Sequence, residues 1–512
     1  MKSKVQFNPI LMFIILIVIT ILLSGILAFF NIQADYSTVN TVTNELSNNN
    51  VVQVENLLSG SGIKEIATTA ITDFVSFAPL SMLIITLMGI GVLEKSGFMK
   101  TFFTLITQNF KKNTLTFLLI LLSILSTLVG DIGYVVFLPI GALLFKYGHR
   151  NPLGGIIAAF AGVSFGYGMN IFLSAIDSSL LTMTLNASHI LDPKYDINVF
   201  FQLFIMLIAI IITSIVFTRI TEKSVMPKLG KYEFDDIETL EDVKITNRQL
   251  RGLIVSLGVG FLYILAIIYM IIPGLPLSGA LLDHSGTYYI DMLFGTNAVF
   301  SQAFVFIITF LFIIVGFIYG FVSKSIKGKD VSDCLSYSLD GIGSILVLIF
   351  MASLFISTLK KSNIGLVLTA LLSNVIGEVS LTGLGLIILL LVISIITHIF
   401  HTGIAVKWSI LSGITVPVFM NASLSPEFAQ IIYTAGVSIA NGITPVMAYF
   451  VIYLAFMEKY NKNGTISIFG SIKYTIPYSF AVMVIWFILI ASFYITGLPL
   501  GIGSMPGVNY VA

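Results

Sequence analysis

The fold is decided by two stretches, AGVSFGYGMN at 161–170 and AGVSIANGITP at 435–445. Both open with the same four letters, and both place glycine, serine and asparagine where the surrounding sequence predicts a continuous apolar helix. Asn151-Pro152 and Ser425-Pro426 lie upstream, and in each case the proline precedes AGVS by nine positions. An Asn or Ser cap followed by proline is a helix start. The pattern therefore predicts, in each half of the chain, a capped helix of about ten residues, a break, and further helix.

The composition is that of a polytopic membrane protein. Of the 512 residues, 57% are hydrophobic and only 10% are charged, whereas soluble proteins carry about 25% charged residues. The net charge of +1 gives no sign of nucleic-acid binding, and the one cysteine, Cys334, has no partner for an internal disulfide. The first apolar run, 9–30, is too long for a signal peptide and lacks a small-residue cleavage site, so it predicts a retained span.

Hydrophobic runs and loop charges together predict the topology. A run of about 20 apolar residues crosses a bilayer, and basic loops stay on the cytoplasmic side. Lys2 and Lys4 precede the first run and the loop 31–70 is mainly acidic, so the N-terminus is expected inside and that loop outside. The loop 221–251 is basic and is expected inside. The predicted spans are 9–30, 71–97, 152–188, 198–220, 252–275, 298–323, 331–358, 426–456 and 475–497.

Two further apolar stretches, 113–147 and 380–424, are interrupted near the middle by short polar residues. Lysine and arginine flank the first on both sides, which predicts a re-entrant hairpin that enters from the cytoplasm and turns back at 130–133. The second is expected to dip in from outside, although Lys360 and Lys361 then violate the positive-inside rule. The sequence thus predicts an all-α protein with nine spans and two re-entrant hairpins, its N-terminus cytoplasmic and its C-terminus extracellular.

Each half contains a broken hairpin followed by a broken helix, and the two halves start from opposite sides of the membrane. This is the pattern of an inverted-topology repeat, which many secondary transporters share. An unwound segment at bilayer depth leaves unpaired backbone groups, so it is tolerated only where it lines a polar cavity or binds a ligand. Half-helix N-termini suit a carboxylate, and freed carbonyls suit a cation. The alternative is that each glycine-rich patch only permits close helix packing.

Ionisable residues inside the apolar stretches are candidates for function, because burying them in a membrane is costly. Asp177 follows the first break and is expected to serve coupling or substrate binding; the alternative is a partnership with a nearby serine or backbone amide. Asp131, at the first hairpin tip, either contacts an ion or caps the following helix. His398, which lies near the second tip with His401 and Thr402, either relays protons or is a hydrogen-bonding group of the core.

Lys407-Trp408 follows the second tip and either binds a substrate carboxylate and an aromatic ring or anchors its helix at the membrane interface. Neutral oxygen-bearing side chains around both breaks suit Na⁺ better than a transition metal. No Cys/His cluster, P-loop or nucleophile elbow occurs in the sequence, which argues against an ATP-driven pump and against an enzyme. No cofactor is expected beyond Na⁺ or H⁺ as the coupling ion. The candidate ion-binding residues are Ser164, Asn170, Asp177, Ser438, Asn441 and Thr444.

Several long motifs, in order along most of the chain, resemble the AbgT family of p-aminobenzoyl-glutamate transporters. The resemblance implies a homodimer in which a scaffold surrounds a transport core holding the hairpins and the broken helices. It also implies cation-coupled movement of p-aminobenzoyl-glutamate, or export of p-aminobenzoate-like antimetabolites such as sulfonamides. The motifs are MGIGVLEKSGF (88–98), GDIGYVVFLPIGALLFKYGHRNPLGGIIAAFAGVS (130–164), AIDSSLL (175–181), KSNIG (361–365), and AVKWSILSGITVPVFM, SPEF and NGITP within 405–445.

The family's substrate positions are only partly kept in this chain. Asp177, Trp408 and Pro426 match the residues that the resemblance implies. The chain departs from the family at four positions, where relatives typically carry Asn, Ser, Arg and Asp. In this chain the four residues are His398, Ala405, Thr434 and Val437.

The expected protein is a plasma-membrane secondary transporter whose core moves like an elevator within the membrane lipid. Two alternatives remain: a divergent relative that moves a different amphipathic solute, such as a peptide or a lipid-linked compound, and a passive channel or non-transporting membrane protein. The scaffold is expected to consist of 1–112 and 191–379, and the second of these ranges includes the cytoplasmic loop 221–251. The two core repeats are expected at 113–190 and 380–456, and the C-terminal span at 457–512.

Overall fold

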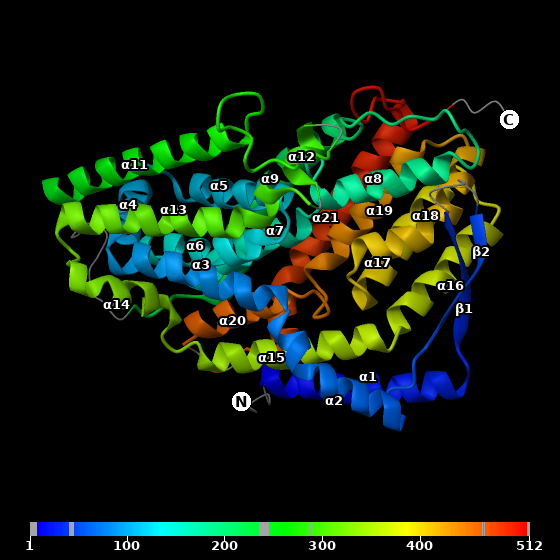
Figure 1. The fold of residues 1–512 in the computed structure, drawn as a ribbon, viewed down its shortest axis with the longest axis horizontal. Helices are drawn as coiled ribbons and strands as arrows, with labels where there is room; N and C mark the ends of the chain where they lie inside the picture. Colours follow the sequence, from blue (N-terminus) through cyan, green and yellow to red (C-terminus); the bar gives the residue numbers. More distant parts are fainter. Residues whose placement is uncertain are drawn as a thin grey trace.

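Helices make up nearly all of the regular structure (Figure 1). The computed structural model describes residues 8–39, 46–234, 245–286, 289–295, 297–462, 464 and 466–508. The helices of the first half are α1 (Pro9–Phe29), α2 (Gly60–Val75), α3 (Ala78–Lys95), α4 (Phe98–Asn109), α5 (Lys112–Leu125), η1 (Ser126–Val129), α6 (Ile132–Tyr147), α7 (Pro152–Phe165), α8 (Ala175–Ser188), α9 (Leu203–Ile220), η2 (Thr221–Val225), α10 (Met226–Leu229) and α11 (Asn247–Ile271). Those of the second half are α12 (Tyr289–Phe294), α13 (Val299–Ser323), η3 (Gly328–Asp330), α14 (Val331–Ser336), η4 (Tyr337–Leu339), α15 (Gly343–Lys361), α16 (Ile364–Glu378), α17 (Leu384–Phe400), α18 (Ile404–Asn421), α19 (Pro426–Asn441), α20 (Phe450–Tyr460) and α21 (Ile468–Thr496).

Nine helical segments of the described residues are long and apolar enough to cross a membrane. The predicted number of spans was also nine, but its members differ. The structural set includes Lys112–Val129 and Ile404–Asn421, which the prediction assigned to the hairpins. It leaves out the two predicted spans that contain AGVS, because their breaks divide them into helices of 14, 14, 16 and 11 residues. Re-entry of the hairpins and the inverted repeat stay predictions.

Both predicted hairpins fold as two helices joined by a tight turn. In the first, α5 and η1 lead to Gly130 and Asp131, and α6 begins at Ile132. Gly130 has a φ of +76°, a left-handed conformation that glycine adopts without strain. In the second, α17 ends at Phe400 and α18 begins at Ile404, which leaves three residues for the turn.

The position of each break was predicted wrongly, because AGVS lies inside a helix in both halves. α7 continues to Phe165 and α19 to Asn441, so the capped helices have 14 and 16 residues rather than about ten, and unwinding begins after them. The glycines of the two motifs instead permit close packing: a Cβ on Gly162 would lie 2.6 Å from the Ser123 Cβ, and one on Gly436 would lie 2.4 Å from the Ser394 Cβ. The packing alternative therefore describes AGVS itself.

These two helices form the centre of the molecule. Every residue of α7 and every residue of α19 is buried. α7 packs against α5 and α6, and α19 packs against α17, which repeats the same contact in the two halves. A helix that is apolar on all sides and buried on all sides belongs to the core of a bundle. The two breaks that follow α7 and α19 are therefore held at the centre.

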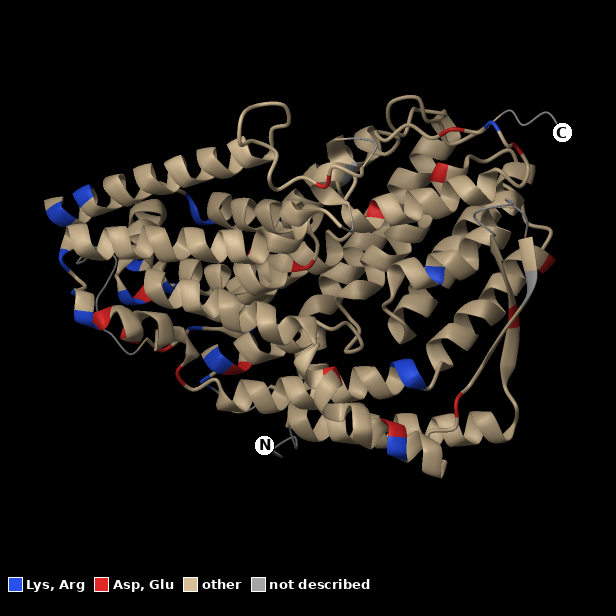
Figure 2. Cartoon of the chain, in the orientation of Figure 1, with Lys and Arg blue, Asp and Glu red and all other residues tan. Residues whose placement is uncertain are grey.

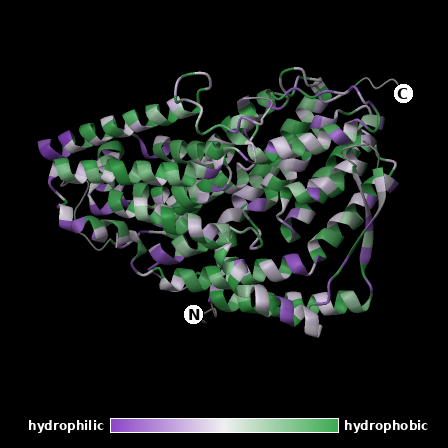
Figure 3. Ribbon diagram, viewed as in Figure 1, coloured by the Kyte–Doolittle hydropathy of each residue, from purple (hydrophilic) through white to green (hydrophobic). Residues whose placement is uncertain are grey.

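The outer helices present apolar side chains to the surroundings, as a lipid-facing surface requires. On α11 the exposed residues include Ile254, Phe261 and Leu262, each at least 60% accessible. Figure 3 shows the hydrophobic character of α11 and α13 along their length. Lysine and arginine gather instead at the end of the molecule where α11 begins and α13 ends (Figure 2). The chain is a multi-pass membrane protein.

Two features of the fold were missed from the sequence. The loop 31–70 contains an antiparallel hairpin of β1 (Gln33–Val39) and β2 (Leu46–Gln53), so the protein is not purely helical. The strands lie against α16 and α18, where Asn374 donates to the Asp35 carbonyl at 3.0 Å. The helix α16 itself occupies a segment between the predicted span 331–358 and the predicted hairpin 380–424.

The predicted violation of the positive-inside rule has a local explanation at Lys361. Its ammonium lies 2.7 Å from Asp73 of α2, and Ser357 donates to the same carboxylate. Because it is paired with Asp73, Lys361 is not an isolated positive charge. A paired cation is less costly near the membrane than a free one.

Candidate functional site

The two breaks meet through the ends of α7 and α19. Asn441, the last residue of α19, donates from Nδ2 to the carbonyl oxygen of Ser164 at 3.3 Å. Ser438, one turn earlier, donates from Oγ to the carbonyl of Phe165 at 2.5 Å. The accepting carbonyls lie in the last turn of α7, where a helix leaves such groups without internal partners. The end of α19 therefore closes the free end of α7.

Each break is also tied to the hairpin of its own half, at matching positions. Asn170 stands nine positions after the first residue of its AGVS, and Thr444 nine positions after the first residue of the second copy. Thr127 of η1 donates to Asn170 Oδ1 at 3.0 Å. Thr444 Oγ1 donates to the carbonyl of Ile399 in α17 at 2.8 Å. The matching contacts give the two halves the same connection between break and tip.

Asp177 is bound within the first break. Its Oδ2 accepts hydrogen bonds from Asn170 Nδ2 at 2.8 Å, Ser174 N at 3.0 Å and Ser174 Oγ at 2.8 Å. Ser174 Oγ in turn accepts from the Asp177 amide, which completes a capping box at the start of α8. The carboxylate thus occupies the positive N-terminus of α8. The partnership with a serine and a backbone amide is present, and a coupling role for Asp177 stays a prediction.

A buried polar chain runs from hairpin 2 to hairpin 1 through Asn441. Lys407 Nζ lies 2.9 Å from His398 Nδ1, and His398 Nε2 lies 3.2 Å from Asn441 Oδ1. Asn441 Nδ2 also donates to the Tyr134 hydroxyl in α6 at 3.2 Å. Lys407 and His398 are completely buried. These contacts join hairpin 2, the end of α19 and hairpin 1, whereas Asn170 and Asp177 of the first break bond to each other instead.

Trp408 is fully buried and lies in the core rather than at an interface. Its ring stacks on Tyr433 of α19, with centroids 4.6 Å apart, and its Nε1 donates to Thr184 of α8 at 2.9 Å. Thr184 also donates to Gln430 Oε1 at 2.7 Å. Trp408 therefore joins α18, α8 and α19. Its neighbours Tyr433, Thr184 and Gln430 were not among the site residues predicted from the sequence.

The other family positions are spread along α18 and α19. Thr434 faces the first break, where a Cβ on Gly168 would lie 3.4 Å from the Thr434 Cβ. Val437 is buried one turn from Asn441, and Ala405 is half-buried in the first turn of α18. Pro426 is the first residue of α19. At 1.5 Å per residue it lies about 22 Å from Asn441, so these two cannot line one small site.

The residues predicted for the hairpin tips are placed there by the structure. Asp131 occupies the N-cap position of α6 but makes no capping hydrogen bond. The rings of Tyr134, in the first turn of α6, and Tyr449 stack 5.1 Å apart. At the second tip, Thr402 Oγ1 donates to the Val446 carbonyl at 3.5 Å, and His401 lies against Gly365 of α16.

The polar side chains around the two breaks carry mainly oxygen atoms, those of serine, threonine and asparagine. No group of three or more His, Cys, Asp or Glu side chains suited to a metal occurs among the described residues. Serine, threonine and asparagine oxygens, with backbone carbonyls, are ligands that Na⁺ accepts. The Ser438 hydroxyl donates to a carbonyl and accepts from Trp486 Nε1. The Thr444 hydroxyl donates to a carbonyl and accepts from the Val446 amide.

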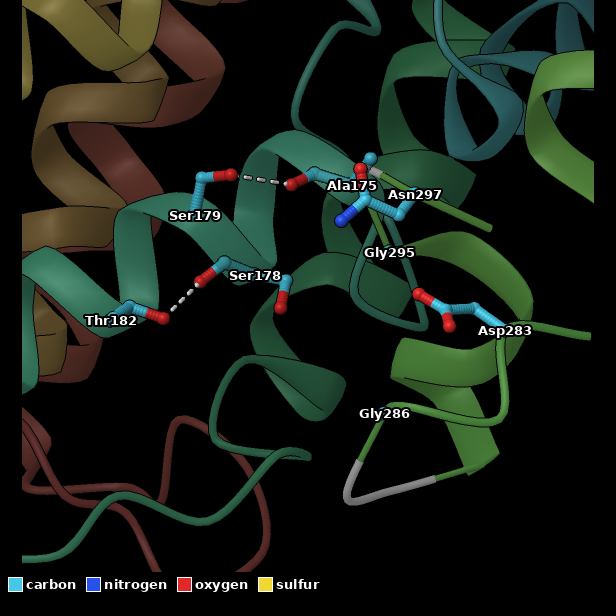
Figure 4. Close-up of a pocket in the computed structure, with 8 residues that line it drawn as sticks. All are labelled: Ala175, Ser178, Ser179, Thr182, Asp283, Gly286, Gly295 and Asn297. Atoms are coloured by element: carbon cyan, nitrogen blue, oxygen red, sulfur yellow. Dashed lines mark hydrogen bonds between the residues drawn. The ribbon is translucent and has the colours of Figure 1, made fainter. Parts of the chain in front are cut away.

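A separate pocket of about 210 Å³ lies on the other side of α8, toward the connection between α11 and α13 (Figure 4). Hydrogen bonds from the Ser285 hydroxyl and amide lower the pKa of Asp283 at its edge, so this carboxylate is charged at neutral pH. Asp177 is buried away from it. The pocket is lined by Ala175, Ser178, Ser179, Thr182, Asp283, Gly286, Gly295 and Asn297.

Known proteins match this chain along almost its whole length. The p-aminobenzoyl-glutamate transport protein of Escherichia coli (strain K12) is 26% identical over 500 residues, which is 98% of this chain and 94% of that protein. Among solved structures, the YdaH transporter of Alcanivorax borkumensis is 25% identical, with 97% of this chain and 100% of that chain covered and a TM-score of 0.48. MtrF of Neisseria gonorrhoeae, described as one of a class of antimetabolite efflux pumps, is 29% identical with 98% of both chains covered and a TM-score of 0.48.

The family model of these transporters matches residues 4–508. The matched range contains both breaks, both hairpins and every candidate residue. The relatives are transporters and not enzymes. This chain belongs to the AbgT putative transporter family.

Proposed function

We propose that the protein is a cation-coupled secondary active transporter of the plasma membrane that moves p-aminobenzoyl-glutamate or p-aminobenzoate-like antimetabolites such as sulfonamides. The observation that carries the proposal is the junction at Asn441, where the two breaks and both hairpins are joined by buried polar contacts. Unpaired backbone at the centre of a membrane protein is costly unless it serves a ligand. The relative from Escherichia coli supports the solute class.

The proposed mechanism separates a moving core from a fixed scaffold. The core consists of 113–190 and 380–456, and the scaffold of 1–112, 191–379 and 457–512. Contacts within the core are buried and polar, whereas α11 and α13 pack mainly against each other and α3. We infer an elevator-like motion of the core, in a homodimer whose scaffolds face each other and whose basic loops lie in the cytoplasm, with the C-terminus outside.

The proposed coupling ion is Na⁺ or H⁺. For Na⁺, the ligands are drawn from the oxygens of Ser164, Asn170, Ser438, Asn441 and Thr444. For H⁺, the carriers are Asp177 and His398. A cation bound beside Asp177 would compete for the carboxylate oxygen that now closes the start of α8. Binding would then be linked to the geometry of the break.

Transport in proteoliposomes tests this proposal. The purified protein is reconstituted, and uptake of labelled p-aminobenzoyl-glutamate and of a sulfonamide is measured under a Na⁺ gradient, a pH gradient, both, or neither. Accumulation of a solute above the external concentration under one of the gradients is the expected result. A solute that only equilibrates across the membrane would identify a passive channel. The absence of flux under every gradient would show that the protein does not transport these solutes.

A divergent solute is the second candidate, favoured by the uncharged surroundings of the second break. Thr434 and Val437 stand where relatives carry an arginine and an aspartate, and both are buried and neutral in this chain. A guanidinium clamps a carboxylate through two parallel hydrogen bonds, which threonine cannot replace. The same uptake assay with a panel of amphipathic peptides and lipid-linked compounds distinguishes this candidate.

A further inference from the structure

Lys407 is a completely buried lysine without a carboxylate partner among the described residues. Its ammonium group meets His398 at 2.9 Å and the face of Tyr433, whose ring centroid is 5.7 Å away. Taking an ammonium out of water without a counter-charge is strongly unfavourable. A protein that keeps such a lysine in its core either keeps it neutral or uses it to meet an anion.

The elements packed around α18 offer no fixed anion to Lys407. These elements are α8, α16, α17, α19 and β1. Their carboxylates are engaged elsewhere or stand at element ends: Asp177 caps α8, and Glu427 in the first turn of α19 accepts from Tyr195 and Ser504. Asp35 on β1 and Glu378 at the end of α16 form no ion pair with it. The titratable neighbours of Lys407 on α17 are the two histidines near the tip, His398 and His401.

The hydrogen-bond chain fixes where the protons lie. Asn441 must turn its NH₂ group toward the Ser164 carbonyl, which can only accept, so its Oδ1 faces His398. His398 must then donate from Nε2, and its Nδ1 is left as an acceptor for Lys407. The imidazole is therefore neutral. Lys407 and His398 together hold at most one excess proton, because a second would set an N–H against an ammonium with no acceptor between them.

Next to Lys407 lie two stacked aromatic rings. Trp408 and Tyr433 stack at 4.6 Å, and Lys407 lies over the outer part of the same tyrosine. A positive group beside aromatic faces is chemically complementary to a carboxylate attached to an aryl ring. We propose that Lys407, positioned by His398, binds the carboxylate of an aryl carboxylate solute, and that one proton enters the site with each anion.

This inference rests on the proposed function and adds to it the solute's charge, the binding group and the coupled ion. In the structure, the pair is neutral and closed; on binding, Lys407 takes one proton from water and its ammonium faces the solute's carboxylate, so that the net charge in the core is unchanged. The anion reaches Lys407 only when the turn 401–403 leaves the second break. The contacts to be broken there are Thr402 to Val446 and Thr444 to Ile399.

Calorimetry on the purified full-length protein tests the proposal. Binding of p-aminobenzoate is measured in buffers with different ionisation enthalpies, which gives the number of protons taken up per anion. About one proton is expected for the wild type, by linkage. The neutral isostere p-aminobenzamide should bind about 10- to 100-fold more weakly, as the loss of a charge-assisted hydrogen bond requires.

Lys407→Met should weaken p-aminobenzoate binding by about 10- to 100-fold and abolish the proton uptake. The matched control is Lys473→Met, an exposed lysine on α21, which should change neither quantity. Lys407→Arg keeps the charge, so it should retain binding without proton uptake, which keeps the test informative if the methionine variant folds poorly. His398→Asn should bind more weakly than the wild type and change the proton count.

Two results would overturn the inference: Lys407→Met that binds p-aminobenzoate as the wild type does with the same proton uptake, or a wild type that binds no aryl carboxylate. The second result would not by itself overturn the proposed function. Gradient-driven uptake of a neutral sulfonamide would then support a transporter without an anion site at Lys407. Carboxylate binding with proton uptake but without gradient-driven flux would support the binding site at Lys407 and would contradict the proposed active transport.

Discussion

In the first half of the chain, α7 ends at Phe165, and the next helix opens with a carboxylate, Asp177, closed into a capping box by Ser174. In the second half, α19 ends at Asn441, and the next helix, α20, opens at Tyr449 without a side-chain cap. The buried lysine of the second half lies instead on its hairpin, where Lys407 contacts a histidine. The two halves share the arrangement of hairpin, buried helix and break, but they differ in where their buried charged side chains lie.

This difference indicates a division of labour between two similar units. The first half supplies its own anion at the helix start, which fills the place that a solute carboxylate would take. The second half supplies a buried lysine without a carboxylate partner among the described residues. Under the proposed function, a solute carboxylate would bind on the side of Lys407 and a coupling cation on the side of Asp177. Each of the following experiments changes one half and uses the other as its reference.

The largest effect is expected at Asp177. Asp177→Asn removes the negative charge but keeps an oxygen that accepts from Ser174, so the protein should fold while coupled transport falls to background in proteoliposomes. Ser174→Ala is the control, since it removes the cap and one hydrogen bond to Asp177 but keeps the charge, and it should cost about 1 kcal/mol in the stability of α8. Unchanged uptake kinetics in Asp177→Asn would leave this residue with a capping role alone.

The next effect concerns the junction. Asn441→Leu removes the hydrogen-bond partner of the Ser164 carbonyl, of His398 and of Tyr134. Each buried polar group without a partner lowers the free energy of unfolding by about 1–3 kcal/mol. We expect a loss of about 3 kcal/mol in the free energy of unfolding, seen as a lower melting temperature of the detergent-solubilised protein. Thr444→Val, which removes the hydrogen bonds to the Ile399 carbonyl and from the Val446 amide, should lower it less. Equal shifts would mean that the halves are not joined through Asn441.

The two AGVS glycines test whether the halves pack alike. Gly162→Ala and Gly436→Ala each force a Cβ against a serine Cβ within 2.6 Å, and overpacking costs about 1–3 kcal/mol. Gly258→Ala in α11 is the matched control, because nothing lies within 4 Å of its added Cβ, and it should stabilise the helix by about 1 kcal/mol. A melting temperature lowered by only one of the two variants would break the equivalence of the halves.

The smallest effect is expected at Lys361, which has the carboxylate partner that Lys407 lacks. A double-mutant cycle of Lys361→Met and Asp73→Asn should give a coupling of about 1 kcal/mol, because both side chains remain partly accessible. Thermal melts of the four proteins measure it. A coupling near zero would mean that pairing does not explain how this lysine is tolerated.

Much of the fold was predictable because membrane helices leave a strong signal. Continuous apolar runs such as 9–30 and 298–323 correspond closely to α1 and α13, and the cap signals at Asn151 and Ser425 mark the observed starts of α7 and α19. The ends of these helices were not predictable, since glycine in AGVS has two uses. It can end a helix or let two helices approach, and only the partners Ser123 and Ser394 decide between them.

The candidate site was predictable in its parts but not in its connections. The polar residues 170 and 444 were selected from the breaks, and both contact their hairpins. The pairing of Lys407 with His398 joins two helices across a turn, and Tyr134 lies 307 positions from its partner Asn441. Such contacts depend on how helices cross, which hydropathy does not encode. The β-hairpin was missed because its strands are polar and lie against other helices.

A cryo-electron microscopy structure of the protein with p-aminobenzoate tests most directly the claim that the two breaks form one solute site. We predict density for the solute between 166–174 and 442–449, with its carboxylate within hydrogen-bond distance of Lys407 Nζ. Density for the solute in the pocket behind α8, beside Ser178 and Thr182, with both breaks unchanged, would contradict it.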